Sequence, residues 1–287
     1  MLEVIRILFG AAFTLVVSVV FGQLFLWRLR ISLNKGEATA FAFLSGAALA
    51  SVAVFFLCLV SMARWSVFLL VGLGTVAWWG WRFRPLVRRR KQQAHVAWFN
   101  SYFVPFYLAL AVFLFIYFIN SLAPALSPPG ATDHLGNIAR IWQQHGFAWN
   151  YSTALSALPQ GTEMLFLLAY SFGRDSSAAL VHLFFLITLA LLIVCYGKRF
   201  GFPKGGAFAA VLVVSAPVVG EAGVSADNDL ALAALVFGVV YLLQVWDENK
   251  DVNLLISIGL LSGFASAVRY SGVLSLLFAA GFVWLRS

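Results

Sequence analysis

The stretch SSAALVHLFFLITLALLIVCY, residues 176–196, contains no Asp, Glu, Lys or Arg and is apolar over almost its whole length. A helix needs about 20 predominantly apolar residues to cross the hydrocarbon core of a bilayer. The stretch therefore predicts a membrane-spanning helix, in which every backbone polar group finds its partner within the helix.

The composition of the whole chain also indicates that most of it lies in a lipid bilayer. Of its 287 residues, 62% are hydrophobic and 10% are charged, whereas soluble domains are roughly 45–50% apolar and about 25% charged. This excludes a soluble enzyme, a disordered chain and a secreted disulfide scaffold. Cys58 and Cys195 lie inside apolar runs with no partner at metal-ligand spacing, so we expect both to be small buried hydrophobic residues.

Eight further apolar runs surround the first one and predict an all-α, polytopic transmembrane bundle of about nine spans. The runs cover residues 4–27, 38–62, 65–81, 101–122, 206–220, 229–246, 252–268 and 271–285. The closely spaced last four could be tilted or broken. We divide the chain into residues 1–100, with three spans and a basic loop, and residues 101–287, with a first outer loop at 123–175.

The distribution of Lys and Arg predicts the orientation of these spans. Loop 82–91, RFRPLVRRRK, carries six positive charges, which favours the cytoplasmic side. The same side then receives Arg28, Arg30, Lys35, Lys198, Arg199, Lys204, Lys250 and Arg286. The net charge of +8 is thus largely an orientation signal and does not indicate nucleic acid. Binding of anionic lipid head groups by loop 82–91 is the alternative.

The outer loop predicts two short helices. Leu135, Ile138, Ile141 and Trp142 share one face at helical spacing, while Asn137, Arg140, Gln143 and Gln144 take the others. This pattern is typical of an amphipathic helix lying in the membrane interface. Residues 163–172 are too few to cross a bilayer, so we expect a re-entrant or juxtamembrane helix that Gly173 ends.

The outer side also holds the acids that could carry chemistry. Asp133 opens the amphipathic helix, either as its N-cap or as a functional carboxylate. Asp227 and Asp229 lie at the start of a span, shortly after Glu221. A helix N-terminus needs only one capping residue, so this number of acidic residues exceeds what capping requires. They indicate a general base, a metal site for a hard cation or a proton path, against ordinary solvation of a loop.

Arg269 lies between two closely spaced spans, where a cation needs an acid, an anionic ligand or a route to the interface. Its planar guanidinium suits a phosphate. His134 is adjacent to Asp133 and could assist it. His182 lies on an apolar helix face, which favours a packed, hydrogen-bonded residue over a ligand.

Several degenerate motifs follow one another between residues 121 and 285. They are DHL at 133–135, IARIWQQHG at 138–146, LPQGTEML at 158–165, FGRDSSAALVH at 172–182, GKRFG at 197–201, SAP at 215–217, SADND at 225–229 and GLLSGFASAVR at 259–269. In order, spacing and sidedness they resemble the polytopic GT-C glycosyltransferases, the group of protein mannosyltransferase-like and lipid A aminoarabinose transferase-like enzymes.

The resemblance implies transfer of a sugar from a polyprenyl-phosphate-linked donor to a lipid, glycan or protein acceptor. It implies a bacterial inner membrane and an active site that faces the periplasm. Asp133 takes the place of the catalytic base, and Asp227 or Asp229 takes the second acidic position. Arg269 would hold the donor phosphate, and we expect His134, Arg140 and Glu163 to complete the substrate-binding set.

Two departures from the family pattern affect these expectations. Many relatives carry an Asp-Glu pair where this chain has Asp133 and His134, so a divalent cation stays open and no other cofactor is implied. Three additional spans precede the first outer loop, and residue 287 follows the end of a span, so we expect the N-terminal part of a longer protein.

Two non-enzymatic functions are the alternatives. A transporter or lipid flippase would use Asp227, Asp229 and Arg269 to line a path for protons or substrate. It should carry charges near the bilayer midplane and contain repeats with broken helices. The second alternative is a structural subunit of another membrane enzyme.

Overall fold

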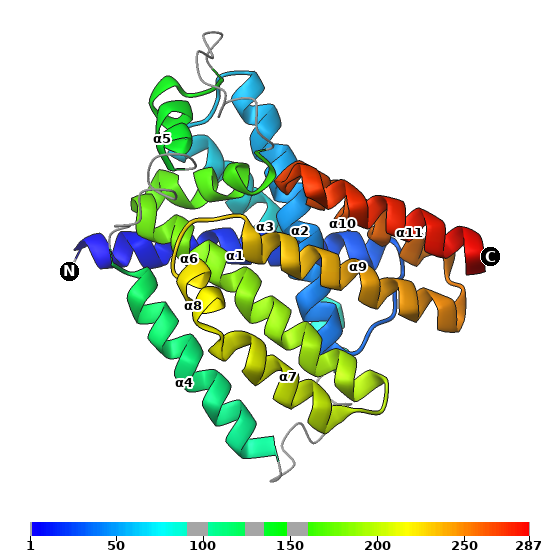
Figure 1. Cartoon of the computed structure of the whole chain (residues 1–287). Helices are drawn as coiled ribbons and strands as arrows, with labels where there is room; N and C mark the ends of the chain where they lie inside the picture. Colours follow the sequence, from blue (N-terminus) through cyan, green and yellow to red (C-terminus); the bar gives the residue numbers. More distant parts are fainter. Residues whose placement is uncertain (1, 91–102, 124–134, 148–159, 287) are drawn as a thin grey trace.

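The computed structural model describes residues 2–90, 103–123, 135–147 and 160–286. Every element within these ranges is helical, as predicted (Figure 1). The elements are α1 (Leu2–Arg28), α2 (Lys35–Leu59), α3 (Trp65–Arg90), α4 (Val104–Ser121), α5 (Leu135–Gln144), α6 (Gly161–Arg199), α7 (Pro203–Ser215), α8 (Pro217–Gly223), α9 (Asp229–Asn249), α10 (Val252–Val268), the 3-10 turn η4 (Tyr270–Gly272) and α11 (Val273–Arg286).

Long apolar helices give the chain the architecture of an integral membrane protein. In the described ranges, five helices are long and apolar enough to cross a bilayer, namely α1, α2, α4, α6 and α9. A sixth span results if α7 and α8, which are bent by 70°, count as one broken span. The predicted count of nine is therefore not confirmed. α6 joins the short helix expected at 163–172 to the span at 176–196, and α10 is an apolar helix shorter than a span.

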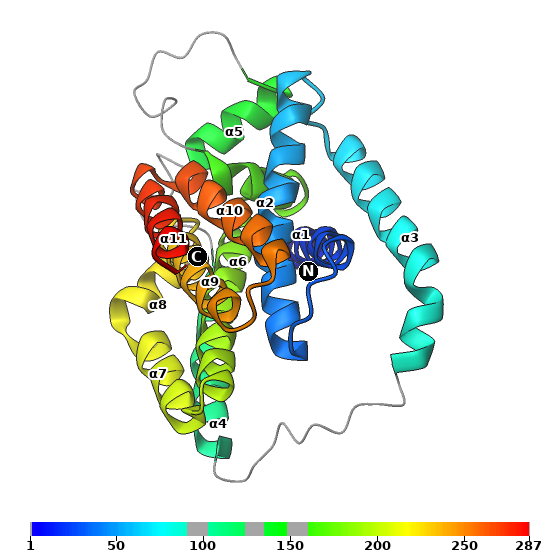
Figure 2. The same ribbon diagram turned by 90° about the vertical axis from the view of Figure 1, so that its right-hand side faces the viewer.

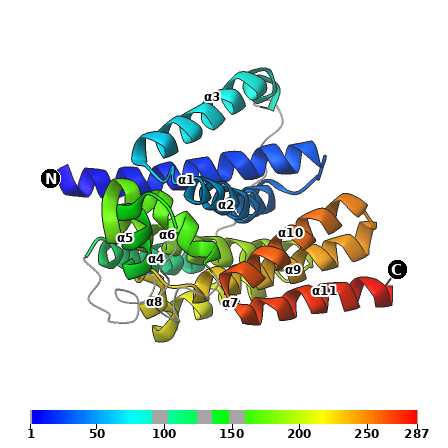
Figure 3. The same cartoon turned by 90° about the horizontal axis from the view of Figure 1, so that it is seen from above.

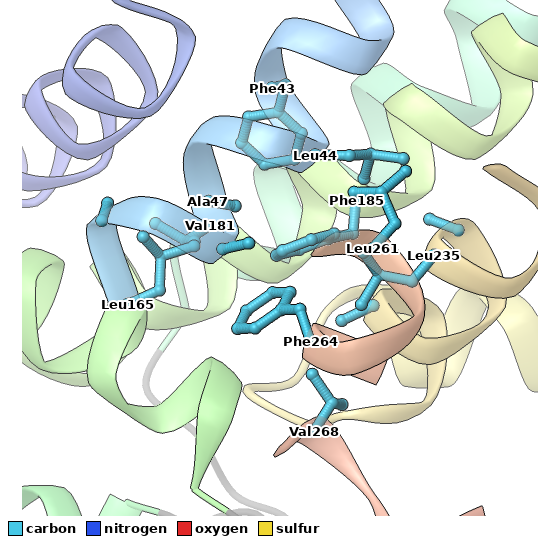
Figure 4. Close-up of a cluster of buried hydrophobic side chains, with 14 of the residues drawn as sticks. Phe43, Leu44, Ala47, Leu165, Val181, Phe185, Leu235, Leu261, Phe264 and Val268 are labelled. Atoms are coloured by element: carbon cyan, nitrogen blue, oxygen red, sulfur yellow. The ribbon is translucent and has the colours of Figure 1, made fainter. Parts of the chain in front are cut away.

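The core lies where α2, α6, α9 and α10 meet. Figure 4 shows Phe43 and Leu44 of α2 facing Phe185 of α6, with Leu235 and Leu261 contributed by α9 and α10. The rings of Phe43 and Phe185 lie 4.9 Å apart at a steep angle, which is a favourable edge-on contact. α6 supplies the largest share of this core because 27 of its 39 residues are buried.

α1 and α2 pack with their backbones in direct contact. A Cβ atom added to Gly46 would lie 1.6 Å from the carbonyl oxygen of Ser18, and one added to Gly22 would lie 1.7 Å from that of Ala42. Small residues that admit such an approach are a common way to hold membrane helices together. The α1–α2 pair depends on glycine at both positions.

α6 is broken at Arg174, where the backbone adopts φ 60° and ψ −149°. The two parts of the helix point in different directions (Figure 1). The hydroxyl of Ser177 lies 2.6 Å from the carbonyl oxygen of Arg174 and 2.9 Å from that of Ala169, so it serves acceptors at the break. The expectation that Gly173 ends this helix places the break one residue early, and the helix resumes at once.

A second break separates α7 from α8. Pro217 has no N–H to donate, so the regular helical hydrogen bond to the carbonyl oxygen of Val213 cannot form, and the N–H of Ala216 lies 3.4 Å from that oxygen instead. The hydroxyl of Tyr117 in α4 donates to the carbonyl oxygen of Val214 at 2.8 Å. This break confirms that one of the closely spaced late runs, 206–220, is broken.

The turn from α9 to α10 and the C-terminal end of α11 lie at the end of the bundle that faces the viewer in Figure 2, which we call the basic end. Arg199, at the end of α6, contacts Glu37 of α2 at 3.0 Å and Glu248 of α9 at 3.3 Å. Lys250 donates to Asp247 at 2.8 Å and to the carbonyl oxygen of Arg286 at 2.8 Å. Three basic residues that the sequence assigns to one side thus lie at a common end.

Candidate functional site

The end opposite the basic end joins the starts of α5, α6 and α9 to the end of α10, and we call it the polar end. Thr162 of α6 donates to the side-chain oxygen of Asn228, which precedes α9, and both residues are buried. Asn137 of α5 donates to the carboxylate of Glu163 at 3.2 Å. These contacts tie segments that lie far apart in the sequence into one site.

Arg269 and Asp229 form an ion pair at this end. Asp229 is the first residue of α9, where a negative charge is favourable, and Arg269 is an extended residue that ends α10. The side chains are 49% and 54% exposed. A pair this exposed contributes about 0–1 kcal/mol to stability, so its partners can exchange for other ions at little cost.

Asp227 lies two residues before Asp229 and is half-buried. Its carboxylate accepts a hydrogen bond from the backbone N–H of Asn228 at 2.6 Å. The structure therefore brings Asp227, Asp229 and Arg269 to the same end of the bundle, together with Thr162 and Asn228.

Glu163 and Arg140, two expected substrate-binding residues, lie in different environments. Glu163 is only 3% exposed and is engaged by Asn137, so it would have to leave that contact to reach a substrate. Asn137 is itself buried, although the helical pattern predicts it on a polar face. Arg140 is exposed on α5, and its Nε donates to the carbonyl oxygen of Gly136 at 3.4 Å.

The amphipathic helix expected before residue 145 is present as α5. Leu135, Ile138 and Ile141 share one face, as predicted, but this face is covered by protein, including α6, whereas the prediction placed it in the membrane interface. Asp133 and His134, the expected base and its neighbour, lie outside the described residues. Within the described ranges, no group of three or more His, Cys, Asp and Glu side chains could hold a metal ion.

His182 contributes more to this site than its sequence context indicates. The ring is fully buried in α6, and its Nδ1 lies 2.9 Å from the carbonyl oxygen of Ala222 and 2.8 Å from that of Ser225. Because both neighbours are acceptors, Nδ1 carries the proton and donates. His182 is therefore the packed, hydrogen-bonded residue that the sequence favours. It also anchors the segment that leads to Asp227 and Asp229, and this partner segment is what the sequence does not predict.

His182→Phe should loosen the segment at residues 222–229. The change removes the Nδ1–H donor. The carbonyl oxygen of Ala222 keeps hydrogen bonds from Ser225, but that of Ser225 loses its histidine donor, and an unsatisfied buried carbonyl group costs about 1–3 kcal/mol. We expect faster amide hydrogen exchange across 222–229, measured by mass spectrometry. His182→Asn, whose amide can supply a donor in the same direction, should restore much of the protection. Equal exchange in wild type and His182→Phe would show that the histidine does not anchor the segment.

Comparison with known proteins identifies no relative of this chain. No family model, curated protein or solved structure matches the chain. A functional assignment therefore depends on the chemistry of the polar end and on the pattern of its residues in the sequence.

Proposed function

We propose that this chain is a membrane glycosyltransferase that moves a sugar from a polyprenyl-phosphate-linked donor to a lipid, glycan or protein acceptor. The observation that carries the proposal is the half-exposed pair of Arg269 and Asp229. An arginine held by a weak, accessible partner is suited to receive a phosphate, because its planar fork donates two parallel hydrogen bonds.

An exchange of partners at Arg269 would provide a cation for the leaving phosphate and a free carboxylate that can accept a proton. When the donor phosphate takes the guanidinium, the carboxylate of Asp229 is released. The bond between the anomeric carbon of the sugar and the phosphate oxygen breaks, and polyprenyl phosphate leaves with the bonding electrons, stabilised by Arg269. The acceptor hydroxyl forms the new bond to the anomeric carbon and gives its proton to a carboxylate, which is Asp133, Asp227 or Asp229.

The position of the site favours surface chemistry on a donor held in the membrane. α5 packs its apolar face at the polar end, close to Glu163 at the start of α6. On this proposal the phosphate of the lipid-linked sugar lies at the membrane surface beside the polar end, and the apolar helices contact the polyprenyl tail. On this proposal the polar end faces the periplasm of a bacterial inner membrane.

Arg269→Gln should lower sugar transfer about 10²–10³-fold, the usual effect of removing one group that stabilises developing negative charge. The assay follows a radiolabelled sugar from polyprenyl-phosphate donors into acceptor in membranes that contain the full chain. Lys204→Gln removes one exposed charge at the other end and is the matched control, for which we expect unchanged transfer. Unchanged transfer in Arg269→Gln would contradict the role of the arginine.

Asp133→Asn tests the expected base separately. Loss of transfer with retained donor binding would assign the proton acceptor to Asp133, since an amide cannot accept the proton. If Asp133→Asn transfers sugar at the wild-type rate, the base is another residue, and Asp227→Asn and Asp229→Asn are the variants that identify it.

A transporter or lipid flippase is the second candidate, and the two helix breaks favour it. Discontinuous helices such as α6 at Arg174 and α7–α8 are common at transporter binding sites. Those sites lie near the bilayer midplane, however, whereas Asp227, Asp229 and Arg269 lie at the polar end. Lipid movement between leaflets of reconstituted vesicles, without any sugar transfer, would favour this second function.

A further inference from the structure

α3 stands apart from the rest of the bundle, with α1 as its nearest neighbour (Figures 2 and 3). The two helices approach closely at Gly72, where an added Cβ atom would lie 2.2 Å from the ring of Phe13. A shallow recess lies between α1, α2 and α3, and all of its lining residues are apolar. Val17, Phe21, Val54, Leu57, Phe68 and Val71 are among them.

The space between α1 and α3 continues from this recess to the basic end, and we call it the crevice. Three arginines that lack an acidic partner in the described part of the chain lie at its basic end. The guanidinium of Arg82, on α3, lies over the indole ring of Trp27, on α1, 5.0 Å from its centre. Arg28 and Arg30 lie one and three residues after Trp27, and all three arginines are solvent-exposed. In the described part of the chain, no acidic side chain pairs with Arg28, Arg30 or Arg82.

Three acids at the basic end already have partners. Glu37 and Glu248 pair with Arg199, and Asp247 pairs with Lys250 and Arg286. The three arginines therefore present a net positive charge that the protein itself does not neutralise. Beside the exposed indole of Trp27, they are suited to an anionic group at the membrane surface.

The recess and the cations are spaced as the parts of a phospholipid are. Phe21 and Trp27 are six residues apart on α1, which corresponds to about 9 Å along a helix. One leaflet of the hydrocarbon core is about 15 Å thick. If α1 crosses the membrane with Arg28 at its surface, the recess lies at the depth of the acyl chains.

We propose that the crevice between α1 and α3 binds an anionic glycerophospholipid. Its phosphate head group contacts Arg28, Arg30 and Arg82, and a part of one acyl chain packs against the apolar recess. This lipid is distinct from the sugar donor, which acts at the polar end, so the proposal stands whether or not the chain transfers sugars.

Lipid retention after purification tests this site. The full chain is reconstituted in vesicles of equal parts phosphatidylglycerol and phosphatidylcholine, extracted in mild detergent and examined by native mass spectrometry. We expect wild type to retain phosphatidylglycerol in preference to phosphatidylcholine. Each basic residue near a membrane surface strengthens the attraction by about fivefold, so Arg28→Gln combined with Arg82→Gln should reduce retention by an order of magnitude or more.

Two further variants separate a built site from general attraction to positive charge. Lys204→Gln removes a charge from the basic end away from the crevice and should leave retention unchanged. Ala53→Trp fills the recess without altering charge and should reduce retention. An equal decrease in Lys204→Gln and the double arginine variant would overturn the proposal. Displacement of the bound phosphatidylglycerol by added polyprenyl phosphate would also overturn it, because the crevice would then belong to the donor.

Discussion

Gly46→Leu should prevent the chain from reaching its native fold. The new side chain would begin 1.6 Å from the carbonyl oxygen of Ser18, and backbone atoms of α1 cannot yield as a flexible side chain can. Ordinary overpacking of a core costs about 1–3 kcal/mol. Here the two helices would have to separate, so the loss should exceed that range and consume much of the roughly 5–15 kcal/mol that keeps a protein folded.

The yield of monodisperse protein after membrane extraction and the melting temperature measure this effect. Gly259→Leu is the matched control, because a Cβ atom at that helical position meets nothing within 4 Å. We expect Gly259→Leu to behave like wild type and Gly46→Leu to aggregate. A folded Gly46→Leu protein with an unchanged melting temperature would mean that α1 and α2 do not pack through this glycine.

Glu37→Ala should produce the second-largest loss of stability. The carboxylate of Glu37 is 1% exposed and contacts Arg199 at 3.0 Å and the hydroxyl of Tyr241 at 2.8 Å. It also accepts hydrogen bonds from the backbone and side chain of Asn34. Removing one member of a buried pair costs about 3–5 kcal/mol. Because Arg199 keeps Glu248 as a partner, we expect the lower end of this range.

Glu248→Ala provides the comparison for Glu37→Ala. Its carboxylate also contacts Arg199 but is 48% exposed, so its removal should cost no more than about 1 kcal/mol. Glu37→Gln keeps the shape and one acceptor and should fall between the two. The free energies of unfolding in mixed micelles rank the three variants. Equal losses in Glu37→Ala and Glu248→Ala would show that the buried contact is no stronger than the exposed one.

The helical class and several faces of the fold follow from the sequence. Unbroken apolar runs predict helices because the bilayer leaves the backbone few other options. The spacing of Leu135, Ile138 and Ile141 correctly predicts the buried face of α5. Cys58 and Cys195 are buried and unpaired with each other, as their apolar surroundings indicate.

Other features depend on contacts between distant residues, which a single sequence does not reveal. Asn137 is buried because Glu163, far along the chain, offers it a partner. The break in α6 falls on Arg174, which adopts a positive φ although it is not a glycine. Because glycine adopts such a conformation most easily, the sequence points to the adjacent Gly173 instead. The count of about nine spans is not confirmed in the described residues, where α10 and α11 are apolar helices of fewer than 18 residues, and apolar composition does not separate a crossing helix from a shorter packed one.

The candidate site is predicted in part for the same reason. Asp229 and Arg269 stand out in the sequence as charges next to spans, but their pairing appears only in the folded chain. His182 stands out least, because its importance comes from two carbonyl groups on another segment.

We propose that the polar end acts on a polyprenyl-phosphate-linked sugar. The most direct test is release of polyprenyl phosphate by the full chain in proteoliposomes, measured across a panel of such donors with an acceptor lipid present. We expect at least one donor to be consumed, with one sugar transferred for each polyprenyl phosphate released, and we expect Arg269→Gln to lower the release about 10²–10³-fold. Consumption of a donor that is unaffected by Arg269→Gln, or lipid movement across the bilayer with no donor consumed, would contradict the proposal.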